Sequence, residues 1–422
     1  PQMELVHHKD ILVQNGRIGE IGENLSCPEE EVVMGADKLL LPALVNSHCH
    51  SAMTLLRGYG EGLPLERWLH EKIFPFEDQL CAEAVYAGSM AAMAEMLRSG
   101  VGSFSDMYFF ADETIRAALE TGMNLNMAKP VTCFDDSSFY QTKDYQIMRD
   151  LYENYHNMNQ GQIKIDMCAH AEYTSTPKVL RGLAEYTATL SEDIRMHIHL
   201  SETLKEHEEC KARHSGKTPA EYMLEQGIFD FPVTAAHCVY AQPGDMEIFK
   251  EKGVSPVYCP SSNLKLGSGF APVSTMLEQG INVTLGTDGA SSNNNLDMLE
   301  EMHLAALLEK GRLTDPTRMP PQQVLQMATA NGAKAQGRYD SGSIQPGFWA
   351  DLTVIDMDKV HLQPCFDMLA NLLFAASSGD VEMTICRGKV LYNKGEYKSL
   401  DIEKVKYQLK KYARETAEKV GK

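Results

Sequence analysis

Residues 41–50 read LPALVNSHCH, and this stretch gives the strongest indication of the fold. The apolar run 41–47 is typical of a buried strand, and it leads directly into His48 and His50. Residues two apart on a strand point to the same side, so both imidazoles can reach one metal ion while Cys49 faces away. A single His-x-His occurs by chance in many proteins, so its meaning depends on the rest of the chain.

Seven further apolar runs follow this one, and longer helical segments separate them. Alternating strands and helices indicate a parallel sheet. Eight such strands within about 250 residues suit a closed (β/α)8 barrel, although periodicity alone does not exclude an open sheet. The seven runs are residues 101–107, 125–130, 163–169, 195–200, 233–238, 254–259 and 283–287.

The two ends of the chain have a different, strand-rich pattern. Residues 10–13 and 17–21 flank Asn15-Gly16, a strong hairpin signal, and residues 350–355 and 383–386 also resemble strands. We therefore predict an α/β fold with three parts. They are a TIM barrel at 45–344, a small β-sandwich domain formed by 1–44 and 345–400, and an amphipathic C-terminal helix at 401–422. Because the chain begins at Pro1 rather than Met, we expect a short N-terminal piece to precede it.

Composition narrows the possible partners. The chain has 39 Lys and Arg against 58 Asp and Glu, a net charge of −19 that repels nucleic acid and anionic lipid. No apolar run is long enough to span a membrane. The ten cysteines have no regular spacing, which indicates reduced thiols in the cytoplasm. We expect a small-molecule substrate and leave a homo-oligomer open.

Polar residues stand at the carboxyl ends of the predicted strands, where barrel enzymes place their sites. The fifth run ends in His197 and His199, the sixth in His237 and the eighth in Asp288. Together with the first two histidines, His199 and Asp288 make a nitrogen and oxygen ligand set suited to Zn²⁺, while Fe²⁺ or Mn²⁺ would accept similar ligands. We interpret His197 as a partner of a ligand histidine rather than a ligand.

We predict one metal ion and a hydrolytic reaction. A barrel with two metal ions would need a group that bridges them, often a modified lysine, after strand four. This chain has His170 at that place. Bound zinc lowers the pKa of water from about 15.7 to roughly 7. Asp288 can take the proton of that water, His237 can orient it, and Glu202 can carry a proton to a ring nitrogen of the substrate.

Six segments resemble the amidohydrolase superfamily, and most closely its S-adenosylhomocysteine and 5′-methylthioadenosine deaminases and their chlorohydrolase relatives. The resemblance implies His48, His50, His199 and Asp288 as metal ligands, with Glu202 and His237 handling protons. The segments are residues 41–58, 170–174, 197–203, 236–238, 259–272 and 286–294.

The resemblance also implies a substrate, an adenine nucleoside. It places His170 on the purine, Glu77 on the ribose hydroxyls and Trp68 on an apolar wall of the pocket, although a core Trp or a helix-start Glu would fit the sequence too. Relatives that take S-adenosylhomocysteine hold its carboxylate with two arginines. Here we find only Lys129 and, nearby, Asp135 and Asp136. We therefore expect a preference for adenosine, 5′-deoxyadenosine or 5′-methylthioadenosine.

Two alternatives stay open at this point. Related enzymes act on guanine, pterins or chlorinated triazines, and a fold alone does not decide the substrate. A non-catalytic scaffold on a hydrolase fold is a more remote alternative, because such a protein would be expected to lose its metal ligands.

Overall fold

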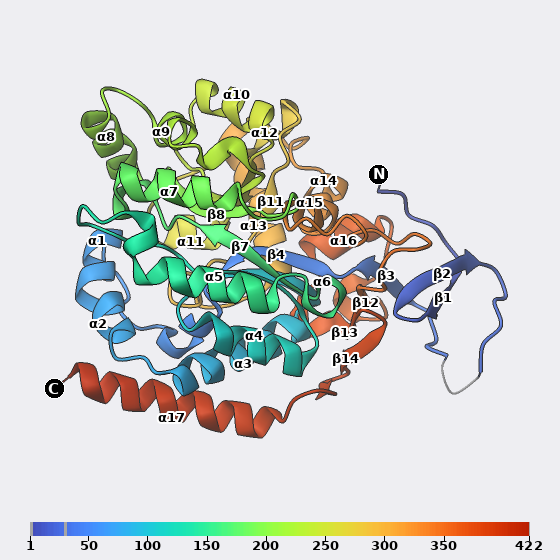
Figure 1. The fold of residues 1–422 in the computed structure, drawn as a ribbon. Helices are drawn as coiled ribbons and strands as arrows, with labels where there is room; N and C mark the ends of the chain where they lie inside the picture. The colour runs from blue at the N-terminus through green and yellow to red at the C-terminus, as the bar shows by residue number, and fades with distance from the viewer. Residues whose placement is uncertain (1–2, 29–31, 422) are drawn as a thin grey trace.

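The computed structural model describes residues 3–28 and 32–421, so Pro1, where the sequence begins, lies outside the described residues. Eight parallel strands form one sheet in the order β11-β10-β9-β8-β7-β6-β5-β4, with helices around it (Figure 1). The predicted barrel is confirmed. Its strands are β4 (Leu44–Cys49), β5 (Val101–Met107), β6 (Asn124–Ala128), β7 (Ile163–Cys168), β8 (Met196–Leu200), β9 (Val233–His237), β10 (Ser255–Tyr258) and β11 (Thr284–Leu285).

The first predicted strand needs a correction, because residues 41–47 span two strands of different sheets. Strand β3 (Lys38–Pro42) pairs with β12 (Leu352–Asp356) outside the barrel, whereas β4 pairs with β5. The change occurs at Ala43, whose N–H donates to Asp351 O, while the next N–H, from Leu44, donates to Gly100 O. One apolar run therefore supplies both sheets.

The barrel closes between its last and first strands through a few specific bonds. The Asp288 N–H donates to His48 O at 3.0 Å, and the Thr287 N–H donates to the Asn46 side-chain oxygen at 3.0 Å. The Asn46 amide in turn donates to the Thr287 hydroxyl at 2.7 Å. These bonds bring the residues after β11 next to the end of β4.

Helices cover the outside of the barrel, and buried faces of Leu, Met, Ala and Val pack them against the strands. They are α1 (Leu65–Trp68), α2 (Phe74–Glu77), α3 (Ala82–Arg98), α4 (Ala111–Thr121), α5 (Lys143–Tyr155), α6 (Met158–Gly161), α7 (Pro177–Thr187), α8 (Leu204–Arg213), α9 (Pro219–Glu225), α10 (Pro243–Lys252), α11 (Pro260–Lys265), α12 (Val273–Glu278), α13 (Met298–Leu313), α14 (Pro321–Met327) and α15 (Ala330–Ala335).

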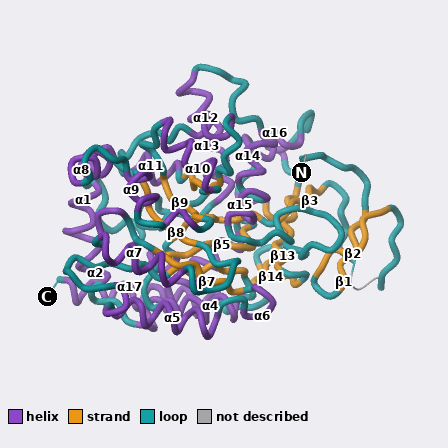
Figure 2. The backbone as a smooth tube through the Cα atoms, turned by 45° about the horizontal axis from the view of Figure 1, so that its top comes forward, coloured by secondary structure: helices purple, strands orange, loops and turns teal. Residues whose placement is uncertain are grey.

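Both chain ends contribute to a small antiparallel β domain, as predicted. Its five-stranded sheet has the order β15-β14-β13-β12-β3, and the hairpin of β1 (Asp10–Gln14) and β2 (Arg17–Gly22) forms a separate two-stranded sheet. Ile18 of the hairpin packs with Ala350 and Leu352. Figure 2 shows these strands at one side of the barrel. The other elements of this part are β13 (Val381–Cys386), β14 (Lys389–Asn393), β15 (Glu396–Tyr397) and α16 (Met368–Phe374).

The last helix, α17 (Ile402–Val420), lies along α3 on the outside of the barrel (Figure 1). Asp401 caps its first turn by accepting from the N–H groups of Glu403 and Lys404. We propose residues 45–344 as the barrel domain and residues 1–44 with 345–400 as the small one. Within residues 3–28 and 32–421, no helix combines the length and apolarity needed to cross a bilayer.

Candidate metal centre and active site

The predicted ligand residues come together at the carboxyl end of the barrel. His48 is in β4 and His50 follows it, His199 is in β8, and Asp288 follows β11. The Asp288 Oδ1 atom lies 3.5 Å from His48 Nε2 and 3.3 Å from His50 Nε2. The Nε2 atoms of His50 and His199 are 3.3 Å apart. The four side chains can therefore contact one common centre.

Two of the imidazoles are fixed by backbone carbonyls. His50 Nδ1 lies 2.6 Å from Met107 O, and His199 Nδ1 lies 3.0 Å from His170 O. A carbonyl only accepts, so each Nδ1 carries the proton and each Nε2 presents a lone pair to the centre. This is the tautomer that metal-binding histidines adopt.

His48 provides a direct test of whether a cation fits. Its Nε2 atom is buried and has no hydrogen-bond partner, and its Nδ1 lies 3.0 Å from His197 Nε2. A buried polar atom without a partner costs about 1–3 kcal/mol, and a metal ion would satisfy it. His197 contacts the far side of the His48 ring, where it can accept the Nδ1 proton.

Asp288 is the anionic member of the group. Its Oδ2 atom accepts from Ser262 Oγ at 2.5 Å and from Ser292 Oγ at 2.9 Å, while Oδ1 accepts from the Gly289 N–H at 2.7 Å and faces the histidines. Burial by itself raises the pKa of this carboxyl, but the adjacent His48 and His50 outweigh burial and hold it well below its ordinary value. Asp288 is therefore a carboxylate.

His237 and Glu202 form a pair beside this group, with His237 Nε2 at 3.8 Å from Glu202 Oε2. The Asn263 side-chain oxygen lies 2.9 Å from His237 Nδ1, so it accepts the proton of that nitrogen and Nε2 faces Glu202. Burial raises the pKa of Glu202 above its ordinary value. This shift favours the protonated form, which can donate a proton to a substrate.

Two of the predicted substrate contacts, His170 and Glu77, lie near the histidines of this centre. The His170 ring is 4.8 Å from the His199 ring, its Nδ1 is buried without a partner, and burial lowers its pKa to about 3, so the ring is neutral. Glu77 ends α2 and is half-buried, and burial raises its pKa to about 7. Trp68 ends α1 and is buried in the main core.

Lys129 is held by an acidic neighbour. Its Nζ atom lies 2.6 Å from Asp144 Oδ1 and 2.6 Å from the carbonyl oxygen of Pro130. Asp144 is in α5, so the ammonium is neutralised by the protein itself. Lys129 lies close enough to His170 for its charge to lower the His170 pKa, and Asp144 pairs with its ammonium.

The sequence argument missed three supporting residues. Asp106, at the end of β5, accepts from the Ser51 N–H at 2.6 Å and fixes the turn after His50. Glu206 accepts from the N–H groups of Ser201 and Glu202, and Asn263 orients His237. Asp106 could have been predicted, because it stands at the end of an apolar run as Asp288 does. Glu206 could have been predicted from the capping-box pattern Thr203-x-x-Glu206. Asn263 had no such signal.

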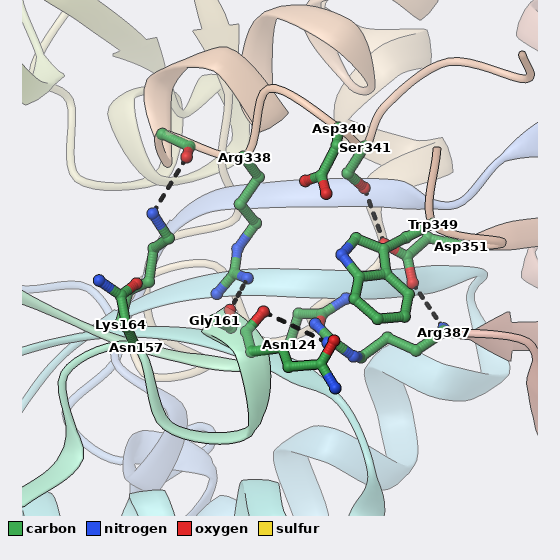
Figure 3. Close-up of a pocket in the computed structure, with 12 residues that line it drawn as sticks. Asn124, Asn157, Gly161, Lys164, Arg338, Asp340, Ser341, Trp349, Asp351 and Arg387 are labelled. Atoms are coloured by element: carbon green, nitrogen blue, oxygen red, sulfur yellow. Dashed lines mark hydrogen bonds between the residues drawn. The ribbon is translucent and has the colours of Figure 1, made fainter. Parts of the chain in front are cut away.

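A polar cavity of about 210 Å³ lies at the opposite, amino end of the barrel strands (Figure 3). Trp349 is stacked between the Arg387 and Arg17 guanidinium groups, at 3.6 and 3.9 Å from the ring centre. Arg338 donates to the carbonyl oxygens of Leu125 and Gln162. These cations connect the small β domain and the barrel, far from the carboxyl-end site.

The barrel, with histidines and an aspartate gathered at its carboxyl end, defines a barrel enzyme built around a metal centre. The chain belongs to the amidohydrolase family, whose sequence model matches residues 39–391.

Individual relatives cover almost the whole chain. It is 42% identical over 415 residues to a 5-methylthioadenosine/S-adenosylhomocysteine deaminase of Thermoanaerobacter pseudethanolicus, covering 98% of this chain and 95% of the relative. It is 41% identical to a 5′-deoxyadenosine deaminase of Methanosarcina mazei, with 97% and 94% covered. Among solved structures, an adenosine deaminase from Xanthomonas campestris with bound zinc superposes with a TM-score of 0.91 at 29% identity, covering 99% and 95% of the two chains.

Proposed function

We propose that this protein hydrolytically deaminates an adenine nucleoside, giving the inosine analogue and ammonia. The observation that carries the proposal is the His237–Glu202 pair, 3.8 Å apart, beside four side chains that can share one cation. Such a pair can move protons between a nucleophilic water and the amino-bearing ring. The names of the relatives, which act on adenine nucleosides, support the same substrate class.

We infer that His48, His50, His199 and Asp288 would hold one Zn²⁺ ion. Three imidazole nitrogens and one carboxylate oxygen are donors that zinc prefers, although Fe²⁺ or Mn²⁺ would accept them. When bound, the ion makes water nucleophilic at neutral pH. A single ion is favoured because His170 follows β7, where a second ion would need a bridging group.

The chain's own residues then direct the protons. Asp288 accepts the proton of the attacking water, and His237 orients that water through the tautomer that Asn263 fixes. Glu202 donates a proton to a ring nitrogen of the purine, which makes the amino-bearing carbon electrophilic. The proton held by Asp288 then passes to the amino group, which leaves as ammonia, and Glu202 regains a proton from the hydroxyl on the attacked carbon.

For the substrate contacts, we infer that His170 hydrogen-bonds the purine, Glu77 accepts from the ribose hydroxyls and Trp68 forms an apolar wall. Asp144 neutralises Lys129, which leaves a poor site for the carboxylate of S-adenosylhomocysteine. We therefore propose that adenosine, 5′-deoxyadenosine and 5′-methylthioadenosine are preferred over S-adenosylhomocysteine. The substrate is a small molecule rather than nucleic acid, the location is cytoplasmic, and a homo-oligomer is compatible with these roles.

An ammonia-release assay with zinc-loaded protein tests the function. The substrates are the four adenine nucleosides, guanine and a pterin, and a parallel chloride-release assay follows a chlorotriazine. We expect release from the nucleosides, with the lowest kcat/KM for S-adenosylhomocysteine. Faster turnover of guanine, the pterin or the triazine would contradict the nucleoside assignment. A protein that binds no metal and releases no ammonia would indicate a scaffold instead.

The Glu202→Gln substitution tests the proton transfer itself. Glutamine keeps the shape of the side chain but cannot donate and accept the proton, so kcat should fall by about 10²–10⁴-fold. Bound metal, measured by elemental analysis, should stay at the wild-type level because Glu202 is not a proposed ligand. An unchanged kcat would remove Glu202 from the mechanism.

A further inference from the structure

A second group of ligand-type side chains lies outside the proposed active site. It consists of Glu172, in the short 3-10 helix Glu172–Thr174 after β7, Cys210 in α8, and His214 directly after α8. One donor atom from each residue lies within 4.8 Å of the others. Cys210 and His214 are four residues apart, so they lie on one side of the helix end.

The three side chains are held in place before any ion binds. Glu172 is 1% exposed, and its Oε1 atom lies 2.6 Å from His214 Nε2. The His214 ring stacks on Tyr222 with 3.7 Å between ring centres and 16° between planes. Cys210 is completely buried, with its sulfur 3.6 Å from Lys217 O. Little conformational freedom remains to be lost on binding.

A purely structural interpretation explains part of this group. The Glu172 carboxylate accepts from Arg213 at 2.6 Å as well as from His214, so a buried ion cluster could exist without a metal. The Cys210 thiol donates to Lys217 O and also faces the same carboxylate, so sulfur, oxygen and nitrogen donors meet at one place. Arg213 lies 2.6 Å from Oε2 and 3.4 Å from Oε1, so an ion would take the place of the His214 proton beside Oε1.

We propose that Glu172, Cys210 and His214 form a second cation site, selective for Zn²⁺ or a similar thiophilic divalent ion, with water as the fourth ligand. Carboxylate oxygen, thiolate sulfur and imidazole nitrogen together match zinc rather than magnesium or calcium. On binding, the Cys210 thiol proton passes to water. The proton on His214 Nε2 is replaced by the ion, and the ring carries its proton on Nδ1.

The location indicates a structural role. Glu172 follows the proposed purine contact His170 by two residues, and α8 begins just after the proposed acid Glu202. An ion at this place would fix the end of α8 to the loop after β7, and both segments lead to catalytic groups. A thiol must lose its proton to bind a metal ion, so uptake should strengthen with rising pH.

Cobalt binding to the full chain tests the site. The proposed active-site ligands contain no sulfur, so a sulfur-to-cobalt charge-transfer band would report a thiolate ligand only. We expect wild-type protein to bind two equivalents of Co²⁺ and to show this band. Cys210→Ser should lose the band and one equivalent while retaining ammonia release. The control Cys365→Ser, which changes a half-buried cysteine elsewhere, should keep both.

Two results would overturn the second site. One is wild-type protein that binds a single equivalent without a sulfur band, and the other is a band that survives Cys210→Ser. If that variant does not fold, His214→Gln replaces it. This variant keeps the thiol, and the affinity for the second cobalt should fall at least ~10-fold. Failure of ammonia release with an intact sulfur band would count against the proposed function alone.

Discussion

A single amide decides which nitrogen of His237 carries a proton. Asn263 accepts from His237 Nδ1 at 2.9 Å, so the Nε2 lone pair faces the reaction centre. Asn263→Ala should lower kcat by roughly 10–100-fold, because the imidazole can then adopt the other tautomer and rotate. Steady-state kinetics with adenosine measure the effect. Asn263→Asp keeps an acceptor at this place and should recover most of the activity, whereas equal losses in both variants would contradict the role in setting the tautomer.

The role of Glu77 distinguishes an enzyme that acts on nucleosides from one that acts on free bases. A carboxylate that accepts two ribose hydroxyls contributes binding energy only when ribose is present. Glu77→Ala should therefore raise KM for adenosine about 10-fold, which corresponds to about 1.4 kcal/mol, and leave the slower turnover of free adenine unchanged. Parallel assays with the two substrates measure this. Unchanged adenosine kinetics would favour a free-base substrate, while an equal loss with both would mean that the substitution disturbs the pocket.

The sequence predicted the residues at the barrel mouth because they are metal-binding residue types that stand at the ends of predicted strands. His50, His199 and Asp288 stand at the ends of apolar runs, and parallel strands bring those ends together. The supporting side chains have no such regularity. Asn263 lies inside α11 and Ser292 in a loop, and their contacts with His237 and Asp288 depend on how segments pack after the barrel closes. Packing of this kind is not encoded in a local pattern.

At the scale of elements, a buried carboxyl joins two helices behind the site. Glu301 in α13 is fully buried and accepts from the Ser261 N–H at 3.1 Å, at the start of α11. The same helix α11 carries Ser262 and Asn263, so Glu301 supports the residues that hold Asp288 and His237. Burial raises the pKa of Glu301 to about 8.

This raised pKa predicts a pH dependence of stability. Between its unfolded value, about 4.3, and about 8, folded Glu301 holds a proton that the unfolded chain has released. The folded state therefore binds more protons, and its contribution to stability falls as pH rises through this window. Glu301→Gln has no such titration, so the urea midpoint of this variant should rise relative to the wild-type midpoint between pH 5 and pH 8. Glu247→Gln, at an exposed position in α10, is the control and should follow the wild type. If the midpoints of Glu301→Gln and the wild type differ by a constant amount across this range, the raised pKa is contradicted.

Helices and strands were predicted well where the sequence pattern is regular. They were predicted less well where one apolar run contributes to two strands. The hairpin around Asn15-Gly16 follows from two adjacent residues that accept positive φ, here 52° and 78°. Residues 41–47 gave no sign that the chain changes sheets at Ala43, because apolar residues stand on both sides of it, at the end of β3 and the start of β4. Strand β11 is only two residues long, and polar bonds after it, rather than a longer ladder, complete the barrel.

At the scale of the whole molecule, the proposed metal joins the same strands that close the barrel. Only a few bonds connect the residues after β11 with β4, among them Asp288 N–H to His48 O at 3.0 Å. An ion held by His48, His50, His199 and Asp288 would add a link from these strands to β8, and it would bind the folded state alone.

Removing the metal should therefore destabilise the entire fold rather than the site alone. A ligand present at a thousand times its Kd stabilises by about 4 kcal/mol, so chelation should lower the Tm by roughly 5 °C or more. Scanning calorimetry before and after chelation, with zinc added back, measures this. Asp288→Ala should start with a lower Tm and respond less to chelator than the wild type, whereas Cys210→Ser should keep most of the response because its active-site ligands are intact. A wild-type Tm that does not change on complete metal removal, confirmed by elemental analysis, would show that the barrel closes without help from the ion.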